Sequence, residues 1–282
     1  MMTRQQEVTT AVVAAAGSAT RMWPASKAIP KELFPVGRIP AILHLVAEFA
    51  AAGIKRVILV VAPKYLDLFR SFFDRSLSPP PRLSDDPIAR GFDQILACLE
   101  ITLLPQLGSY GNATPLITAA GHVGAAPCVY AFGDDIVFGE NVTGGLLSIY
   151  ALRNRSVMAA QEVDDSKRSS FGIIEGYLDD GTFLVTRLIE KPTATQTTSN
   201  LAAFGRYIVT PDLLNTLLHV PPGRDGEIWF VDGIIQQIRE GKEICAFPLT
   251  KGKWYTVGDP DSYTRAVVAA AASPPSSFAV PL

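Results

Sequence analysis

The chain has 282 residues, 48% of them hydrophobic, so it is long enough to bury a sizeable core and too apolar for a disordered protein. Its 25 lysines and arginines against 27 aspartates and glutamates give a net charge of -2, with no basic block that would follow the phosphate backbone of DNA or RNA. Cys98, Cys128 and Cys245 lie far apart and form no CxxC pair, which argues against a disulfide framework and a thiolate zinc site.

The beginning of the chain is polar, and the first apolar run is short. Residues 11–16 form that run, which is too short for the core of a signal peptide or for a membrane span. We therefore expect a cytoplasmic protein that binds neither a membrane nor nucleic acid.

The first half alternates apolar runs with helical patterns. Residues 11–17 form an apolar run that ends in glycine, as in a strand buried on both faces of a parallel sheet. A helical pattern over residues 41–52 then stops at Gly53. The alternation continues with strands at 57–62, 101–106 and 128–135 and helices near 64–74, 92–99 and 115–123. Four strands separated by helices predict a doubly wound, Rossmann-like, mostly parallel sheet.

The second half predicts a small antiparallel addition to this sheet. Candidate strands lie at 156–163, 171–192 and 202–209, and the turn DDG joins two strands within the second of these segments. A helix at 232–240, a strand ICAFPL and a helix at 262–271 follow. We expect one α/β domain over 1–282, with a proline-rich insertion loop at 76–90 and a loosely held tail at 272–282. The Ala- and Val-rich end of the chain also indicates a contact in a homo-oligomer.

Candidate ligand groups follow the predicted strands. In open α/β sheets ligands bind beyond the carboxyl ends of the strands. The first strand leads into a glycine-containing loop with Arg21, Lys27 and Lys31, a combination that suits a polyphosphate. Asp134 and Asp135 follow another strand and suit Mg²⁺. A surface loop with solvated lysines and an aspartate pair that caps a helix remain the alternatives.

These residues resemble a known family. The stretch GSATRMWPASKAIPKELFPV, residues 17–36, is similar to the signature GxGTRxxPxTxxxxKxxxP of the sugar-1-phosphate nucleotidyltransferases, and most similar to the bacterial UTP–glucose-1-phosphate uridylyltransferases. The resemblance continues through GDDI, SFGII, LIEKP, NLAAFGRYIV, GEIWFVDGI and YTVGDPDSY, in the order of the family. It implies the nucleotide-diphospho-sugar transferase fold. It also implies a Mg²⁺-dependent enzyme that joins a sugar 1-phosphate, first glucose 1-phosphate, to a nucleoside triphosphate, first UTP, and releases pyrophosphate.

The resemblance also implies a set of site residues. The catalytic positions are Arg21, Lys31 and Asp134, with Asp134 as the metal ligand. The nucleotide positions are Ala15, Ala16, Gly17, Ser18, Gln106, Gly111 and Asp135. The sugar-phosphate positions are Gly172, Glu190, Lys191, Asn200 and Arg206. From the residues alone, a solvated strand-end pair at Glu190 and Lys191 and a turn glycine at Gly172 remain the alternatives.

The sequence departs from the family pattern at three places. Ala19 replaces a glycine, and its methyl group is expected to crowd the phosphates or to disfavour a positive φ angle. Thr256 stands where the family has a second metal aspartate, and GNATP replaces a GLGHA-like segment that reads the base. These changes leave open a different nucleotide, such as dTTP, CTP or GTP, and a catalytically weak protein that binds nucleotide sugars. An NAD-dependent Rossmann enzyme is disfavoured because GxGxxG is absent.

Overall fold

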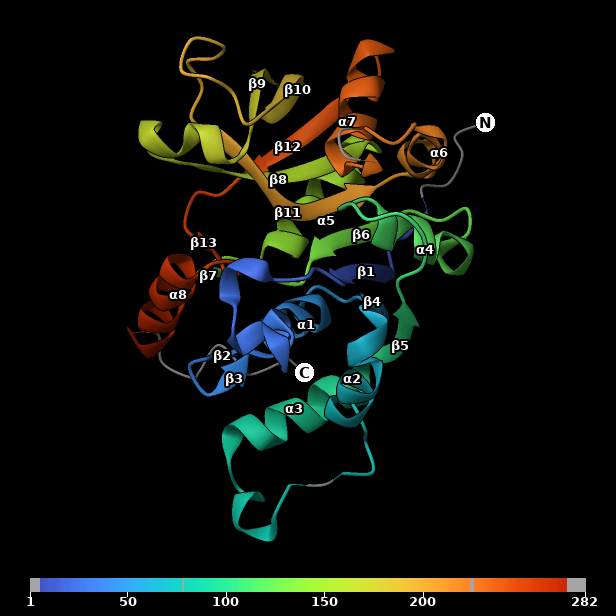
Figure 1. The fold of residues 1–282 in the computed structure, drawn as a ribbon. Coiled ribbons are helices and arrows are strands. Elements are labelled where there is room, and N and C mark those ends of the chain that lie inside the picture. Colours follow the sequence, from blue (N-terminus) through green and yellow to red (C-terminus); the bar gives the residue numbers. More distant parts are fainter. Residues whose placement is uncertain (1–5, 78, 224–225, 273–282) are drawn as a thin grey trace.

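A mixed β-sheet forms the centre of the computed structural model, which describes residues 6–77, 79–223 and 226–272 (Figure 1). Within these residues the sheet has nine strands in the order β5-β4-β1-β6-β11-β8-β12-β10-β9. The strands are β1 (Thr10–Ala15), β4 (Arg56–Val61), β5 (Glu100–Pro105), β6 (Cys128–Phe132), β8 (Ser156–Glu162), β9 (Gly172–Asp179), β10 (Thr182–Glu190), β11 (Leu201–Val209) and β12 (Ile244–Pro248).

The first half forms the parallel part of the sheet, as the sequence predicts. β5, β4, β1 and β6 pair in parallel, in that order. Their apolar runs suit this position because helices cover both faces of the sheet there. β6 then pairs antiparallel with β11, and β9 and β10 form a hairpin whose turn places Asp180 at φ 45 and Gly181 at φ 73. The predicted antiparallel addition is therefore present, although β8 and β12 within it run parallel.

Helices cover the two faces of the sheet and bury two separate clusters of apolar side chains. On one face lie α1 (Ala41–Ala51), α2 (Leu66–Phe72), α3 (Pro87–Cys98) and α5 (Val142–Arg153). On the other face lie α4 (Thr114–Val123), α6 (Pro211–His219) and α7 (Phe230–Arg239). The sequence pattern did not predict α5 and α6. Among the described residues, no helix has the length and apolar character that a membrane crossing requires.

Two short ribbons lie beside the main sheet. One pairs β2 (Pro35–Val36) with β3 (Ile39–Pro40), and the other pairs β7 (Asp135–Phe138) with β13 (Lys253–Thr256). The last helix, α8 (Pro260–Ala272), packs with residues of both ribbons in a third apolar cluster. The β7–β13 ribbon is important for the site because it brings Thr256 opposite Asp135.

The predicted insertion loop at 76–90 is shorter in the structure. Asp86 accepts hydrogen bonds from the N–H groups of Ile88 and Ala89, and α3 begins at Pro87. Aspartate at the N-cap and proline in the first turn favour the start of a helix, so the end of the proposed loop is helical. Of the predicted tail, Ala272 ends α8, and residues 273–282 lie outside the described residues.

Candidate active site

A cavity of 350 Å³ lies at the carboxyl ends of β1 and β6. Its wall includes several of the residues to which the sequence assigns a role, and others that it does not. The lining residues are Ala14, Ala16, Gly17, Arg21, Lys31, Glu32, Gln106, Tyr110, Gly111, Asn112, Pro115, Phe132, Asp134, Glu227 and Trp229. Arg21, Lys31 and Asp134 therefore share one cavity.

The charged groups of the cavity converge around Gly258. Lys31 Nζ donates to Asp134 Oδ2 at 2.5 Å. A methyl group on Gly258 would lie 3.0 Å from Asp134 Oδ2 and 3.3 Å from both Arg21 Nη2 and Thr256 Oγ1. Residues near both ends of the chain and at its middle thus place a guanidinium, an ammonium, a carboxylate and a hydroxyl at one point.

Two buried ionisable side chains are neighbours in sequence at this point. Burial disfavours the ammonium of Lys31, but the carboxylates of Asp134 and Glu32 outweigh this effect and raise the pKa of Lys31 above its ordinary value. Burial raises the pKa of Glu32 to about 7, although the charge of Lys31 opposes the rise. The cavity therefore keeps a permanent cation beside Asp134.

The loop after β1 supplies backbone donors at the mouth of the cavity. A side chain at Gly17 would lie 3.6 Å from Lys31 Nζ, so the loop and the lysine are in contact distance. Ala19 adopts φ 48 and ψ 42, which shows that its methyl group does not prevent the left-handed conformation. Ser18 donates its backbone N–H to the hydroxyl of Tyr110 at 3.1 Å.

The wall opposite this loop is formed by residues 110–113 and the segment before α7. Ile228 donates its N–H to the carbonyl of Tyr110, and Ala113 donates to the carbonyl of Ile228. Gly111 has φ 141, and a Cβ there would lie 2.3 Å from the carbonyl oxygen of Ile228. Glycine is required because the two backbones touch. Gln106, directly after β5, completes this side.

The predicted sugar side lies next to Trp229. Glu190 Oε2 would be 3.0 Å from a Cβ on Gly172, so the carboxylate lies over the glycine. Burial raises the pKa of Glu190, while Lys191 opposes the shift. Lys191 Nζ lies 5.7 Å from the centre of the Trp229 ring, whose residue lines the cavity. Gly172, Glu190 and Lys191 do not line the 350 Å³ cavity, and they extend the candidate site next to it.

The position of Arg206 in the structure disagrees with its predicted role as a sugar-phosphate ligand. Its side chain is fully buried, and its guanidinium donates to Glu48 of α1 and to the carbonyls of Gly205 and Asp135. The family resemblance gives the position of Arg206 but not the direction of its side chain, and β11 is irregular between Ala203 and Tyr207, where strand alternation does not give that direction either. Arg206 is a structural residue here.

The predicted nucleotide position Asp135 also needs correction. Both oxygens of Asp135 accept hydrogen bonds, from Trp254 Nε1 and from the N–H of Gly205, and its side chain is buried rather than part of the cavity wall. Burial and the charge of Asp134 raise the pKa of Asp135. The side chain of Ala15 packs in a core cluster, and its neighbours Ala14 and Ala16 line the cavity, so the expected contact of the Ala15 backbone with the base stays a prediction. Asn200 donates to Asp165 at 2.6 Å and does not line the cavity, and its role on the sugar side also stays a prediction.

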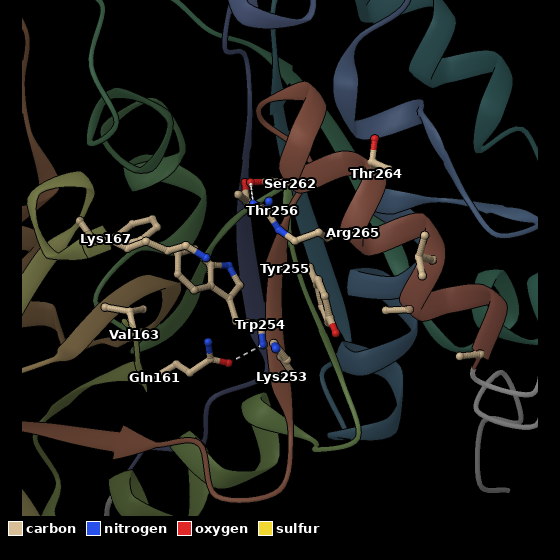
Figure 2. Close-up of a pocket in the computed structure, with 14 residues that line it drawn as sticks. Gln161, Val163, Lys167, Lys253, Trp254, Tyr255, Thr256, Ser262, Thr264 and Arg265 are labelled. Carbon is tan, nitrogen blue, oxygen red and sulfur yellow. Dashed lines mark hydrogen bonds between the residues drawn. The ribbon is translucent and has the colours of Figure 1, made fainter. Parts of the chain in front are cut away.

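Another concavity, of 490 Å³, lies along β13 and is lined in part by Thr256, whose hydroxyl also lies near Gly258 (Figure 2). Figure 2 shows Trp254, Tyr255 and Thr256 along this strand, with Ser262 and Arg265 of α8 beside Thr256. The hydroxyl of Thr256 accepts from the N–H of Gly258 at 3.3 Å. Within the described residues no group of three or more His, Cys, Asp or Glu side chains is arranged to hold a metal ion.

Sequence reasoning missed several residues of the wall. Glu32, Tyr110, Asn112, Glu227 and Trp229 line the cavity without an assigned role. Glu32 directly follows Lys31, and Tyr110 directly precedes GNATP, the segment that departs from the family, so the sequence offered a signal for both positions. It offered none for their burial and contacts.

Comparisons with known proteins agree with this geometry. A model of the family described as nucleotidyl transferase matches residues 10–273. A UTP–glucose-1-phosphate uridylyltransferase of Pseudomonas aeruginosa is 29% identical over 259 residues, or 89% of this chain and 92% of that protein. UTP–glucose-1-phosphate uridylyltransferase 2 of Staphylococcus saprophyticus is 29% identical over 268 residues, or 93% of this chain and 92% of that protein.

A solved structure of UDP-glucose pyrophosphorylase complexed with UDP-glucose superimposes on this chain with a TM-score of 0.85 at 28% identity. The match covers 93% of this chain and 98% of that one, and it confirms the predicted fold. Because the family model spans most of its length, the chain belongs to the nucleotidyl transferase family.

Proposed function

We propose that this protein joins UTP to glucose 1-phosphate to give UDP-glucose and pyrophosphate. The observation that carries the proposal is the convergence of Arg21, Lys31 and Asp134 in one cavity at the strand ends. The named relatives and the matched structure, which was solved with UDP-glucose, support the choice of substrates.

The reaction brings together two anions that repel each other. A phosphate oxygen of the sugar 1-phosphate attacks the α-phosphorus of the triphosphate, the bond to the bridging oxygen breaks, and pyrophosphate leaves with that electron pair. Positioning and charge neutralisation are the main requirements of such a displacement. Lys31, held in place by Asp134, and Arg21 supply fixed cations for this purpose, and Lys191 supplies a cation on the sugar side.

The remaining wall residues orient the two substrates. The loop at Gly17 and Ser18 offers backbone N–H donors to phosphate oxygens. Gln106 and the backbone near Gly111 face the space where the base would lie, and Glu190 over Gly172 would accept hydrogen bonds from sugar hydroxyls. No side-chain nucleophile is needed.

The donor set fits Mg²⁺ in one specific way. Asp134 provides a carboxylate in the cavity, and Thr256 provides a neutral hydroxyl near it. Asp135 is buried, and each of its oxygens accepts one hydrogen bond, from Trp254 and from Gly205. Mg²⁺ is commonly held by one or two carboxylates together with substrate phosphates, which agrees with Asp134 as the main protein ligand. When bound, the ion would neutralise charge on the transferring phosphate.

The test is a pyrophosphate-release assay with a coupled pyrophosphatase, over a grid of triphosphates and sugar 1-phosphates. We expect release from UTP only when glucose 1-phosphate is present, and we expect Asp134→Asn to lower kcat by about 10²- to 10³-fold. Asp67→Asn is the matched control, since Asp67 is 93% exposed on α2. Absence of release with UTP, dTTP, CTP, GTP and ATP and several sugar phosphates would contradict the proposal.

Thr256 favours one alternative, a protein that binds the nucleotide sugar but turns over slowly. Calorimetry that detects UDP-glucose binding while the assay detects no turnover would support this alternative. Recovery of turnover in Thr256→Asp would then identify the missing carboxylate as the cause.

A further inference from the structure

Beside the cavity, a contact joins the loop after β1 to the loop that carries Tyr110. The hydroxyl of Tyr110 accepts the backbone N–H of Ser18 at 3.1 Å and lies 3.3 Å from the Ser18 hydroxyl, across 92 residues of sequence. Both residues are exposed, so the contact is at the surface. We call this pair of hydrogen bonds the Tyr110 latch.

The loop that carries Tyr110 is fixed to the body of the protein. Its backbone is hydrogen-bonded to Ile228, the side chain of Asn112 accepts the N–H of Phe230 at 2.7 Å, and the hydroxyl of Tyr130 on β6 donates to the carbonyl of Asn112 at 2.5 Å. Gly111 packs directly on Ile228. Because the base of the loop is anchored, the latch holds the loop after β1 against a fixed wall.

The latch uses a donor that the proposed function assigns to a phosphate oxygen. Ser18 follows Gly17 in the loop after β1, and the Tyr110 oxygen lies at the distance at which a phosphate oxygen would accept the same N–H. A single N–H cannot donate with full strength to both. The phenol oxygen is neutral, whereas a phosphate oxygen is charged and forms the stronger bond.

From this geometry we infer that the hydroxyl of Tyr110 takes the place of a phosphate oxygen at Ser18 in the ligand-free protein, so that a nucleoside triphosphate must break the latch to bind. This inference rests on the proposed function because it assumes that the loop after β1 binds the triphosphate. A ligand without phosphates does not compete for the Ser18 N–H.

The existence of the latch is tested first, in the ligand-free protein. Hydrogen–deuterium exchange of the Ser18 amide should be faster in Tyr110→Phe than in the wild type, by about two- to tenfold, which corresponds to one net hydrogen bond. Tyr177→Phe, an exposed tyrosine on β9, is the matched control and should leave this amide unchanged. Equal exchange in the wild type and Tyr110→Phe would overturn the inference whatever the protein's substrate is.

The competition is tested by calorimetric titration of UTP and of uridine. We expect the Kd of UTP to fall by about two- to tenfold in Tyr110→Phe, while the Kd of uridine changes by less than about twofold. An unchanged or higher Kd of UTP would overturn the inference, and so would an equal gain for uridine, which would indicate general loosening of the loop. If the amide exchange reveals the latch but neither protein binds any triphosphate, the proposed function and the competition both fail, while the latch remains as a structural contact.

Discussion

Neighbouring residues in this site have different environments, and burial decides which role each one has. Asp134 lies in the cavity beside Lys31, whereas Asp135 is buried and fully hydrogen-bonded to Trp254 and Gly205. Lys31 and Glu32 form a second pair of sequence neighbours. The carboxylates around Lys31 stabilise its charged form, whereas burial destabilises the charged form of Glu32. At the scale of single residues, the consequences of burial can be measured.

Glu32 should make stability depend on pH. Burial raises its pKa from 4.5 to about 7, so between these values the folded protein retains a proton that the unfolded chain has released. The free energy of unfolding should therefore fall as the pH rises from about 4.5 to about 7, by an amount on the order of 3 kcal/mol, and stay level above that range. Denaturant unfolding across this range, in chelator-treated buffer, measures the effect.

The matched variant for this measurement is Glu32→Gln, which removes the titrating group and should lose this part of the pH dependence. Glu162→Gln, an exposed position at the end of β8, should follow the wild type. If the curves of wild type and Glu32→Gln run parallel from pH 4.5 to 7, the buried carboxylate does not carry this proton.

Arg206 should contribute to stability rather than to substrate binding. The guanidinium is fully buried and pairs with Glu48, whose side chain is 10% exposed. Removal of one member of a buried pair leaves an uncompensated charge, so Arg206→Met should lower the free energy of unfolding by about 3–5 kcal/mol. The KM for the sugar 1-phosphate should not change in the folded fraction.

A double variant separates these roles. Glu48→Gln removes the orphaned charge, so Arg206→Met with Glu48→Gln should be at least about 1 kcal/mol more stable than Arg206→Met alone. A large rise in KM at unchanged stability would instead restore Arg206 as a ligand.

At the scale of elements, short local signals decide where loops end and helices begin. Asp86 ends the proline-rich insertion, caps α3 and pairs with Arg38 at 2.7 Å. The Arg38 side chain is 62% exposed, so the ion pair should contribute little. The cap is the stronger interaction because it satisfies backbone N–H groups that have no other helical partner.

Substitution of Asp86 distinguishes the cap from the ion pair. Asp86→Ala should lower the free energy of unfolding by about 1 kcal/mol, and Asp86→Asn, which keeps the capping oxygen, by less than about half of that. Turnover should be the same in both variants, since α3 does not contribute to the cavity wall. Equal losses in the alanine and asparagine variants would show that the ion pair is the more important contact.

At the scale of the whole molecule, the site is assembled from segments far apart in sequence. The segments after β1 and β6 supply the cations Arg21 and Lys31 and the carboxylate of Asp134. The pairing of β13 with β7 then places Thr256 and Gly258 next to these groups. Asp135 ties this ribbon to β11 by accepting hydrogen bonds from Trp254 and Gly205. The buried aspartate therefore helps to hold the shape of the site without lining it.

The sequence by itself determined the parallel half of the sheet, its helices and the three charged residues at the strand ends. These depend on local signals: uninterrupted apolar runs, helical periodicity, and a loop whose glycine and cations adjoin a strand. Tertiary structure alone decided that Arg206 and Asp135 face the interior, that Glu32 is buried, and that Tyr110 reaches Ser18. The physical reason is that the direction of a side chain depends on strand register and on the residues that pack against it. Neither the irregularity in β11 nor the contact between the Ser18 and Tyr110 loops produces a periodic pattern in the sequence.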